Sequence, residues 1–508
     1  MKPIHSFTTA NGIYTNLAFF SLSWLSKFYH NKNYKFFGVS LERIQAFSQF
    51  HFFCLLKTAD NVSSVWDQYP LQNKKEIRQE WFRIILTIYR LLYYLIIPKQ
   101  KISNFNSATQ IVVLSSGRHL DDQTPLIDLL SKRFNIIVVG KFTDNLESLL
   151  NRRKVTFFRI TNGYRLLGRA ERLKNLLIFF FGNWKKMGTD SLLDNTYWQI
   201  RLWYLRLFQF PEIVALLTFA NNMFEKTKPA LLLTTSSNDT FGAAFTLVAQ
   251  KHKIPVAELQ HGYTNFGTDA PFYNADYQLV WGKMPQKIRK AYAKKSAVIV
   301  GCPFLQTRYE NDNNQSAKIL RVLVLWTPPF GSIVLFQSQE NEQTLFNLIE
   351  GLANLPKNYQ VTLRSHPSFD LEILINRIDL PKNIRLDNQG NFKEVVVKHD
   401  IIITQPTTAG FYAALVQKPL LFFSNSWITK KYGDPLINSG SALNVPLPDL
   451  KMIDQYISKL INDGNLLKKQ QLAQEKFVKE YCAYFSKDSC KQIIKFAKKI
   501  IDEKAPIN

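Results

Sequence analysis

The sequence is poor in cysteine, in acidic side chains and in long apolar runs, and each shortage argues against a class of protein. Its 508 residues include four cysteines, scattered along the chain without a CxxC pair. This spacing argues against a zinc site and against a disulfide framework, so we expect buried free thiols in a reducing compartment. No Asp-x-Asp pair lies beside an apolar strand, and no bound metal is expected.

No apolar run is long enough to cross a membrane. The strongest candidate, residues 81–97, contains Arg83 and Arg90, and its uninterrupted apolar part is residues 91–97. A spanning helix needs about 20 apolar residues. The N-terminus lacks a compact apolar core followed by a small-residue cleavage site. We therefore expect a cytoplasmic protein that is soluble or attached peripherally to the inner face of the plasma membrane.

Acidic residues are outnumbered, with 39 Asp and Glu against 64 Lys and Arg and a formal net charge of +25. An excess of this size predicts an anionic partner, such as a membrane surface, a phosphorylated substrate or nucleic acid. The excess is concentrated between residues 152 and 206, where twelve Lys and Arg occur with three acids. No helix-turn-helix, zinc-finger or RNA-binding signature accompanies it, which weighs against nucleic acid.

Part of this basic region has the periodicity of an amphipathic helix. Within residues 164–184, apolar side chains share one broad face while arginines recur at spacings of four and three. Such a helix suits the interface of an anionic membrane, although a core-facing helix with a solvated basic back has the same pattern. The residues expected to face the membrane are Arg165, Arg169, Arg172, Phe180, Phe181 and Trp184.

Short apolar strands alternate with longer helical stretches along most of the chain. Strands are expected at residues 110–114, 135–139, 155–160, 229–235, 254–259, 277–281, 297–300, 321–326, 360–363, 401–404 and 420–423. This alternation predicts parallel sheets covered by helices on both faces.

The predicted fold class is therefore α/β, with two Rossmann-like domains facing a cleft. The first domain comprises residues 106–309, and a polar linker at 310–316 separates it from the second, residues 316–508, which ends in C-terminal helices. An aromatic-rich region, residues 1–105, precedes both domains and is expected to be mainly helical.

The strand expected at residues 254–259 ends in Gln260-His261-Gly262. In open α/β sheets, ligands bind at the carboxyl ends of the strands. A histidine there can exchange a proton near neutral pH, and the glycine lets the backbone approach a ligand closely. A histidine that only caps the strand with a hydrogen bond would give the same pattern.

Two loops at other expected strand ends carry groups that suit anions. In residues 115–122, Arg118, His119 and Asp121 are candidates for binding an acceptor, and a capped turn is an equally good interpretation. In residues 364–367, the planar fork of Arg364 suits a phosphate, while His366 is suited to bind a phosphoryl oxygen or to protonate a leaving group.

A third loop, residues 404–414, places Thr407 and Thr408 where a helix is expected to begin. The free backbone amides and the dipole at the start of a helix favour an anion. Capping of the helix would explain both threonines equally well.

The order and spacing of these motifs resemble the two-domain glycosyltransferase fold called GT-B, over roughly residues 110–425. The similarity is greatest to bacterial surface and capsular polysaccharide transferases and to the polyol-phosphate transferases of teichoic acid synthesis. The matching elements are Lys228-Pro229, Gln260-His261-Gly262, Trp281-Gly282, Gly301-Cys302-Pro303, Arg364-Ser365-His366-Pro367, Thr407-Thr408 and Lys418-Pro419.

The resemblance implies transfer of a sugar from a nucleotide-activated donor to a lipid-linked or surface polysaccharide, without a metal or other cofactor. It implies that His261 and His366 are catalytic, His261 as general base or acceptor-positioning group. The residues implied to bind the donor's phosphates and nucleotide are Arg364, Ser365, Thr407, Thr408 and Gly262. The sequence departs from the family at residues 410–413, which lack the carboxylate that usually holds the donor's ribose.

Three alternatives stay open. The same fold transfers a polyol phosphate from a CDP-glycerol-type donor in related families. An inactive scaffold of polysaccharide assembly would agree with the missing carboxylate. Nucleic-acid binding is the least favoured alternative.

Overall fold

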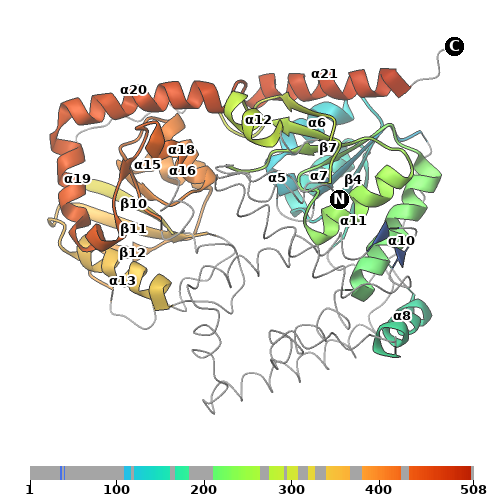
Figure 1. Cartoon of the computed structure of the whole chain (residues 1–508), viewed down its shortest axis with the longest axis horizontal. Helices are drawn as coiled ribbons and strands as arrows, with labels where there is room; N and C mark the ends of the chain where they lie inside the picture. Colours follow the sequence, from blue (N-terminus) through green and yellow to red (C-terminus); the bar gives the residue numbers. More distant parts are fainter. Residues whose placement is uncertain are drawn as a thin grey trace, which may run out of the picture.

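The computed structural model of the protein (Figure 1) describes residues 35–36, 39–40, 108–115, 119–160, 166, 168–181, 210–263, 274–290, 294–306, 319–326, 339–366, 380–424 and 434–504. Of the N-terminal region, this set contains two short antiparallel strands, β1 (Lys35–Phe36) and β2 (Val39–Ser40). The prediction that residues 1–105 are mainly helical otherwise lies outside the described residues.

The first sheet has seven parallel strands in the order β5-β4-β3-β6-β7-β8-β9. In chain order they are β3 (Ile111–Ser115), β4 (Ile136–Gly140), β5 (Thr156–Arg159), β6 (Leu231–Thr234), β7 (Val256–Leu259), β8 (Tyr277–Val280) and β9 (Ser296–Ile299). The central strands are buried along their whole length, as in a parallel sheet covered on both faces. All seven predicted strands of this half are confirmed.

The second sheet has six parallel strands in the order β12-β11-β10-β13-β14-β15. They are β10 (Leu320–Trp326), β11 (Tyr359–Ser365), β12 (Ile384–Leu386), β13 (Ile401–Thr404), β14 (Leu420–Phe422) and β15 (Leu443–Asn444). The four predicted strands of this half are confirmed, and the two short edge strands β12 and β15 are additional. The chain therefore has the expected α/β fold of two parallel-sheet domains.

Helices follow most strands, as the alternation predicts. Those of the first half are α5 (His119–Asp122), α6 (Thr124–Ser131), α7 (Asp144–Arg152), α8 (Arg169–Phe181), α10 (Phe210–Thr227), α11 (Thr240–Lys251) and α12 (Lys283–Lys290). Those of the second half are α13 (Gln339–Ala353), α15 (Phe392–Lys398), α16 (Thr408–Leu415), α18 (Pro435–Asn438), the 3-10 helix η5 (Leu447–Met452), α19 (Ile453–Asn462), α20 (Gly464–Tyr481) and α21 (Ser486–Lys504).

The last helix does not pack with the half of the sequence to which it belongs. Helices α20 and α21 lie nearly end to end along one side of both domains (Figure 1). Apolar side chains of α21, among them Ile493 and Ile500, share a buried cluster with strands β3, β4 and β6. The expected domain boundaries stay a prediction, but α21 completes the core of the first domain rather than that of the second.

The chain returns to the first domain through residues 482–486, which form the crossing segment between α20 and α21. Cys302 N donates to Tyr484 O at 2.8 Å, and Ser486 N donates to Cys302 O at 2.9 Å. Two glycines make room for this segment. A Cβ on Gly282 would lie 2.5 Å from Tyr481 O, and one on Gly301, whose φ is +80°, would clash with the carbonyl of Tyr484.

A buried apolar cluster joins the two halves beside the crossing segment. It contains Trp281 and Phe304 from the first half, together with Phe411 of α16 and Tyr481 of α20. The rings of Trp281 and Phe411 are 5.7 Å apart, and those of Phe411 and Tyr481 are 4.8 Å apart. Lys393 on α15 adds a polar contact by donating to Phe304 O at 2.5 Å. The two domains therefore share a packed core.

The described cysteines agree with the expectation of free thiols. Cys302, Cys482 and Cys490 are buried and unpaired, and Cys54 lies outside the described residues. Burial raises the pKa of the Cys482 thiol to about 12 and that of the Cys490 thiol to about 11. Neither thiol is a nucleophile near neutral pH, because the nucleophile is the thiolate.

Candidate active site at the domain junction

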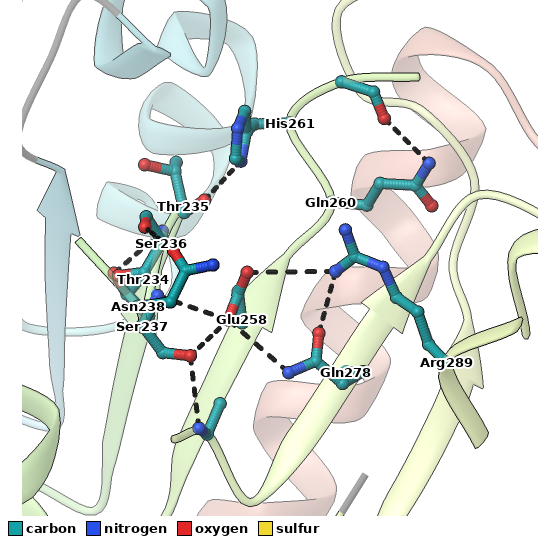
Figure 2. A network of polar contacts seen from close by, with 12 residues as sticks. Thr234, Thr235, Ser236, Ser237, Asn238, Glu258, Gln260, His261, Gln278 and Arg289 are labelled. Carbon is teal, nitrogen blue, oxygen red and sulfur yellow. Dashed lines mark hydrogen bonds and ion pairs between the residues drawn. The ribbon is translucent and has the colours of Figure 1, made fainter. Parts of the chain in front are cut away.

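His261 lies where β7 ends, as predicted, and the loop after β6 fixes the orientation of its ring. Its Nδ1 lies 2.5 Å from the backbone carbonyl of Thr235 (Figure 2). A carbonyl only accepts, so Nδ1 carries the proton and the lone pair of the neutral ring is on Nε2. The imidazole is half-buried. This is the tautomer that a general base needs when it accepts a proton through Nε2.

The loop that holds His261, residues 234–238, is itself held by a buried carboxylate. Glu258, in the middle of β7, accepts a short hydrogen bond from Ser237 Oγ and a second bond from Ser237 N at 3.2 Å. Ser237 Oγ in turn accepts from Asn274 N at 3.0 Å. Figure 2 shows these contacts converging on the turn that carries the carbonyl of Thr235. The turn therefore has little freedom to move relative to β7.

Arg289, on α12, balances the charge of Glu258. Its Nη1 lies 3.8 Å from Glu258 Oε1 and donates to Gln278 Oε1 at 2.8 Å. All three residues are almost completely buried. Removal of one partner from a buried ion pair leaves the other charge in a medium that solvates it poorly, at a cost of about 3–5 kcal/mol. The network thus ties β7, β8 and α12 together beneath His261.

Gln260 secures the other side of the His261 loop. Its side-chain Nε2 donates to Gly262 O at 2.9 Å, and its Oε1 accepts from Trp281 N at 2.9 Å. Trp281 Nε1 donates to the backbone carbonyl of Gln260 at 2.8 Å. This explains why Gln260-His261-Gly262 and Trp281-Gly282 occur together in the sequence, because the first motif is anchored on the second.

The same loop reaches the second domain at the start of α16. Tyr263 N donates to Thr408 Oγ1 at 3.0 Å. A Cβ placed on Gly262 would lie 3.3 Å from Thr408 Oγ1, so a larger residue would crowd this contact. The carboxyl edge of the first sheet and the carboxyl edge of the second therefore meet at this point, as two domains facing a cleft require.

The Tyr263 side chain anchors the loop more deeply in the second domain. Its hydroxyl donates to Asp434 Oδ1 at 2.8 Å, and its ring stacks on Tyr481 at 5.1 Å between centroids. Burial and the negative charge of Asp434 hold the pKa of Tyr263 well above its usual value. The tyrosine therefore stays protonated and keeps donating. His261 thus lies two residues before Tyr263, whose contacts with Asp434 and Tyr481 connect the two domains.

The amino end of α16 has the form expected of an anion site. Thr407 is its N-cap, and its Oγ1 accepts from Gly410 N at 3.0 Å. The cap uses one of the amides at the start of the helix, and the amides of Thr408 and Ala409 precede it on the first turn. Thr407 and Thr408 thus lie at a helix start as predicted, and their role in donor binding stays a prediction.

Two residues of the Arg364-Ser365-His366 motif are engaged differently from the prediction. Arg364 Nη1 donates to Gln389 O and its Nη2 donates to Gly390 O, both at 2.6 Å. Ser365 N and Oγ both donate to Asn388 Oδ1, at 2.9 and 3.2 Å. Both side chains are buried and hold the loop that follows β12, and their binding of the donor phosphates stays a prediction.

His366 is the member of this motif that faces outward. Its side chain is exposed, and its backbone N donates to Trp326 O at 2.8 Å at the end of β10. Strand β11, which carries His366, is two positions from β13, which leads into α16. Neighbouring strands are about 4.8 Å apart, so about 10 Å separates the two strand ends. His366 lies on the same edge of the sheet as α16, but its predicted catalytic role is untested.

The predicted acceptor loop after β3 is described only in part. Arg118 lies outside the described residues, and the side chain of His119 does as well, although its backbone begins α5. Asp121 Oδ1 accepts from Thr143 N at 3.0 Å and from Thr143 Oγ1 at 2.6 Å. Because Thr143 precedes α7, this carboxylate stabilises the start of that helix. Its binding of the acceptor stays a prediction beside this structural role.

The predicted membrane-facing helix exists as α8, with a different orientation. Arg165 and Trp184 lie outside the described residues, as do the side chains of Phe180 and Phe181. Arg169 is exposed, but Arg172 is only 1% exposed, so the prediction that it faces outward is wrong. Leu173 and Leu177 are instead 48% and 47% exposed. The helix packs with this arginine turned inward.

The described residues contain neither a candidate metal site nor a candidate membrane span. No group of three His, Cys, Asp or Glu side chains in this part of the chain is placed to hold a metal ion. No helix in the described ranges combines the length and the apolar character that crossing a membrane requires.

The sequence reasoning missed the two anchors of the His261 loop. A glutamate inside the otherwise apolar run of β7 was the available signal for Glu258, because a charge in a buried strand needs a partner. Its partner Arg289 follows 31 positions later on a helix, where the sequence marks it only as one basic residue among several. No sequence signal pairs Tyr263 with Asp434, which are 171 residues apart.

No family model matches the chain, and no curated protein is similar to it in sequence. Its structure is similar to that of a putative UDP-N-acetylglucosamine 2-epimerase from Listeria monocytogenes, at 12% identity and a TM-score of 0.50, over 79% of this chain and 98% of that one. It is also similar to the glycotransferase of kitacinnamycin, at 12% identity and a TM-score of 0.49, over 77% of this chain and 100% of that one.

A third similar structure is that of S. aureus MnaA solved with UDP, at 13% identity and a TM-score of 0.48, over 77% of this chain and 96% of that one. At such identities the likeness concerns the fold alone. The fold of this chain is therefore the two-domain α/β arrangement known as GT-B.

Proposed function

We propose that the protein transfers a sugar from a nucleotide-activated donor to a hydroxyl of a glycan acceptor, which is lipid-linked or part of a surface polysaccharide, at the cytoplasmic face of the membrane. One observation carries the proposal. The His261 loop of the first domain contacts the amino end of α16 in the second, where Tyr263 N donates to Thr408 Oγ1 at 3.0 Å. A proton acceptor thereby lies beside a helix end that suits a phosphate.

In this reaction the acceptor oxygen forms a bond to the anomeric carbon as the bond from that carbon to the donor's diphosphate breaks. His261 Nε2 accepts the proton of the acceptor hydroxyl, since Nδ1 is already protonated toward Thr235 O. The diphosphate leaves with the bonding electron pair. Its negative charge is stabilised by the backbone amides and dipole of α16. The neutral imidazole becomes imidazolium, and the charges balance.

The fold supports a nucleotide sugar as the donor. The Listeria protein, whose fold this chain shares at a TM-score of 0.50, is described as a putative UDP-N-acetylglucosamine 2-epimerase. The ribose carboxylate expected of sugar transferases is missing from this chain. In the first turns of α16, Gly410, Phe411 and Tyr412 are all buried. Ribose recognition is therefore assigned to other groups of the second domain than this helix.

The first test is nucleotide binding by the full chain. Thermal unfolding is measured with UDP, CDP, GDP and dTDP, and with orthophosphate as a control that fills an anion site without a nucleoside. A nucleotide at 100 times its Kd stabilises the native state by about 2.7 kcal/mol, so at least one should raise Tm while orthophosphate does not. Failure of all four nucleotides to raise Tm would contradict the proposal.

The second test separates the possible reactions on the same fold. The nucleotide that binds is supplied as a panel of its sugar conjugates, with CDP-glycerol beside them, and release of the free nucleotide is measured. Turnover of a sugar conjugate supports glycosyl transfer. Turnover of CDP-glycerol alone indicates a polyol-phosphate transferase, and interconversion of a sugar without nucleotide release indicates an epimerase. Binding without any turnover indicates a scaffold.

A further inference from the structure

The turns that lead into the strands of the first sheet gather positive charge on one edge of the domain. Among the described residues of these turns and of the helix ends that precede them, eleven Lys and Arg are exposed, and three acids, Asp128, Glu225 and Asp276, lie among them. We call this edge the basic rim. It consists of Lys132, Arg133, Arg152, Arg153, Lys154, Lys226, Lys228, Lys251, Lys253, Lys294 and Lys295.

The parallel sheet creates this edge from residues that are far apart in the sequence. The turns precede β4, β5, β6, β7 and β9, and the order of strands runs from β5 at one end to β9 at the other. At about 4.8 Å per strand, seven strands place the cations along roughly 30 Å. The basic residues near residue 152 and those near residue 251 therefore belong to one surface.

The corresponding edge of the second sheet shows that this charge is not a general feature of the fold. The turns before its strands carry single lysines, of which Lys357, Lys382 and Lys398 are exposed, with Asp400 beside them. Both domains have the same arrangement of strands and turns. The excess on the first domain is therefore a property of its sequence, and it has the form of a surface for an anionic partner.

Part of the rim is hollowed. A shallow cavity of about 350 Å³ is lined by Lys253, Lys294 and Lys295 together with Asp276. The cavity has a built framework: Asp276 Oδ2 accepts from Val256 N at 2.9 Å, and Lys294 Nζ donates to Asn274 O at 2.7 Å. Three ammonium groups around a cavity of this size suit one phosphate headgroup, with the remaining cations spread along the surface.

We propose that the basic rim binds the surface of an anionic phospholipid bilayer. Eight of its eleven cations are lysines, which act as point charges and suit a diffuse negative surface more than a specific fork-like contact. Single-stranded nucleic acid would require exposed aromatic rings for stacking. Among the described residues the exposed large aromatic side chain is Tyr484, which lies in the crossing segment and not on the rim.

The rim lies at the opposite end of the strands from His261. From Ile254 to His261 the chain runs along β7, and an extended chain rises about 3.3 Å per residue, so the catalytic loop stands roughly 20 Å from the bilayer. Together with the proposed function, on which this consequence rests, the geometry favours an acceptor hydroxyl at the growing end of a lipid-linked glycan. A sugar next to the lipid would not reach the loop.

The test is sedimentation of the full chain with sucrose-loaded vesicles of phosphatidylcholine, with and without 30% phosphatidylglycerol. Neither donor nor acceptor is needed, so the result is independent of whether glycosyl transfer is observed. The rim variant carries Lys154→Glu, Lys226→Glu and Lys251→Glu. The control variant carries Lys357→Glu, Lys382→Glu and Lys398→Glu on the second sheet and has the same net charge.

We expect the wild type to bind the anionic vesicles and not the neutral ones. A basic residue near an anionic membrane contributes about fivefold to the partition coefficient, so the rim variant should bind at least 100-fold more weakly. The control variant should lose less than fivefold, because its changed charges lie beyond the screening length from the bilayer. If the rim variant does not give a wild-type unfolding transition, the triple Lys→Gln variant replaces it.

Three results would overturn the proposal. The first is equal binding of neutral and anionic vesicles by the wild type. The second is an equal loss for the rim and control variants, which would make net charge the cause. The third is tighter binding to duplex DNA than to the anionic vesicles at the same phosphate concentration, which would assign the rim to nucleic acid.

Discussion

The two histidine loops of the junction look alike in sequence and differ in how the fold holds them. The His261 loop is bonded on both sides, by Thr235 O in its own domain and by Thr408 Oγ1 in the other. In the His366 loop, the polar neighbours Arg364 and Ser365 bind the loop after β12, and the histidine side chain is exposed. The contacts of the first loop therefore fix the position of the His261 side chain, whereas those of the second loop hold that loop within its own domain.

This difference shows that a polar residue at a strand end can form hydrogen bonds with the backbone of a neighbouring loop, whether or not it also binds a ligand. The guanidinium of Arg364 suits a phosphate and equally suits two carbonyl oxygens, which are the acceptors it has here. His261 also bonds a carbonyl, but it does so through Nδ1, which leaves the lone pair of the neutral ring on Nε2. A ring with two separate nitrogens can be positioned and reactive at once.

The largest effect is expected from removal of the support beneath the His261 loop. Glu258→Ala leaves Arg289 buried without its carboxylate, and should lower the free energy of unfolding by about 3–5 kcal/mol in urea denaturation. Glu480→Ala, an exposed glutamate on α20, is the control and should change it by less than about 0.5 kcal/mol. A double variant, Glu258→Met with Arg289→Met, should recover most of the loss. A loss below 1 kcal/mol for Glu258→Ala would show that the network does not support the loop.

A smaller effect is expected from removal of the hydrogen bond between Tyr263 and Asp434, which connects the domains. Tyr263→Phe removes the hydroxyl that donates to Asp434 and keeps the stacking on Tyr481. A hydrogen bond to a charged group contributes about 1.5–3 kcal/mol, and unfolding should become easier by that amount. Tyr484→Phe, in the same junction but with a ring that is 39% exposed, is the matched control. If both variants unfold like the wild type, the contact with Asp434 does not hold the domains together.

The smallest effect concerns the strand of the second loop. His399 Nδ1 donates to Val395 O at 2.6 Å, so Nε2 of the neutral ring accepts from Thr362 Oγ1 on β11 at 3.0 Å. Burial lowers the pKa of His399 from the ordinary 6.5. Because the folded pKa is below the unfolded one, the neutral ring favours folding above pH 6.5 and this stability is lost as the pH falls below it. The free energy of unfolding between pH 7.5 and 5.5 should therefore fall less in His399→Gln than in the wild type.

The wild type, measured over the same pH range, is the reference for this comparison. An unchanged pH dependence in His399→Gln would mean that another group in the chain causes the loss of stability in acid.

Most of the fold could be predicted from the sequence because the buried strands are continuous apolar runs. The run Ile401–Thr404 has no other stable environment than the middle of a parallel sheet. Strands β12 and β15 were not predicted, since they are three and two residues long and carry exposed positions at the edge of the sheet. The crossing of α21 to the first domain was not predictable either, because its apolar face fits either core.

The candidate site was predictable in position and less so in detail. The expected ends of the strands were enough to predict that His261, His366 and Thr408 lie on facing edges of the two sheets. The sequence gives no measure of which hydrogen-bond partner lies within reach, so the contacts of Arg364 and Asp121 with the backbone were not predicted. The basic residues were noticed as a run along the chain, and only the order of strands shows that they form one edge.

The most direct measurement compares the two histidines in a steady-state transfer assay. If His261 is the base, His261→Ala should lower kcat by about 10²–10⁴-fold with little change in the donor KM. His366→Ala should lower kcat less than tenfold and act mainly on the donor KM. An equal or smaller loss of kcat in His261→Ala than in His366→Ala would contradict the assignment of His261 as the catalytic base.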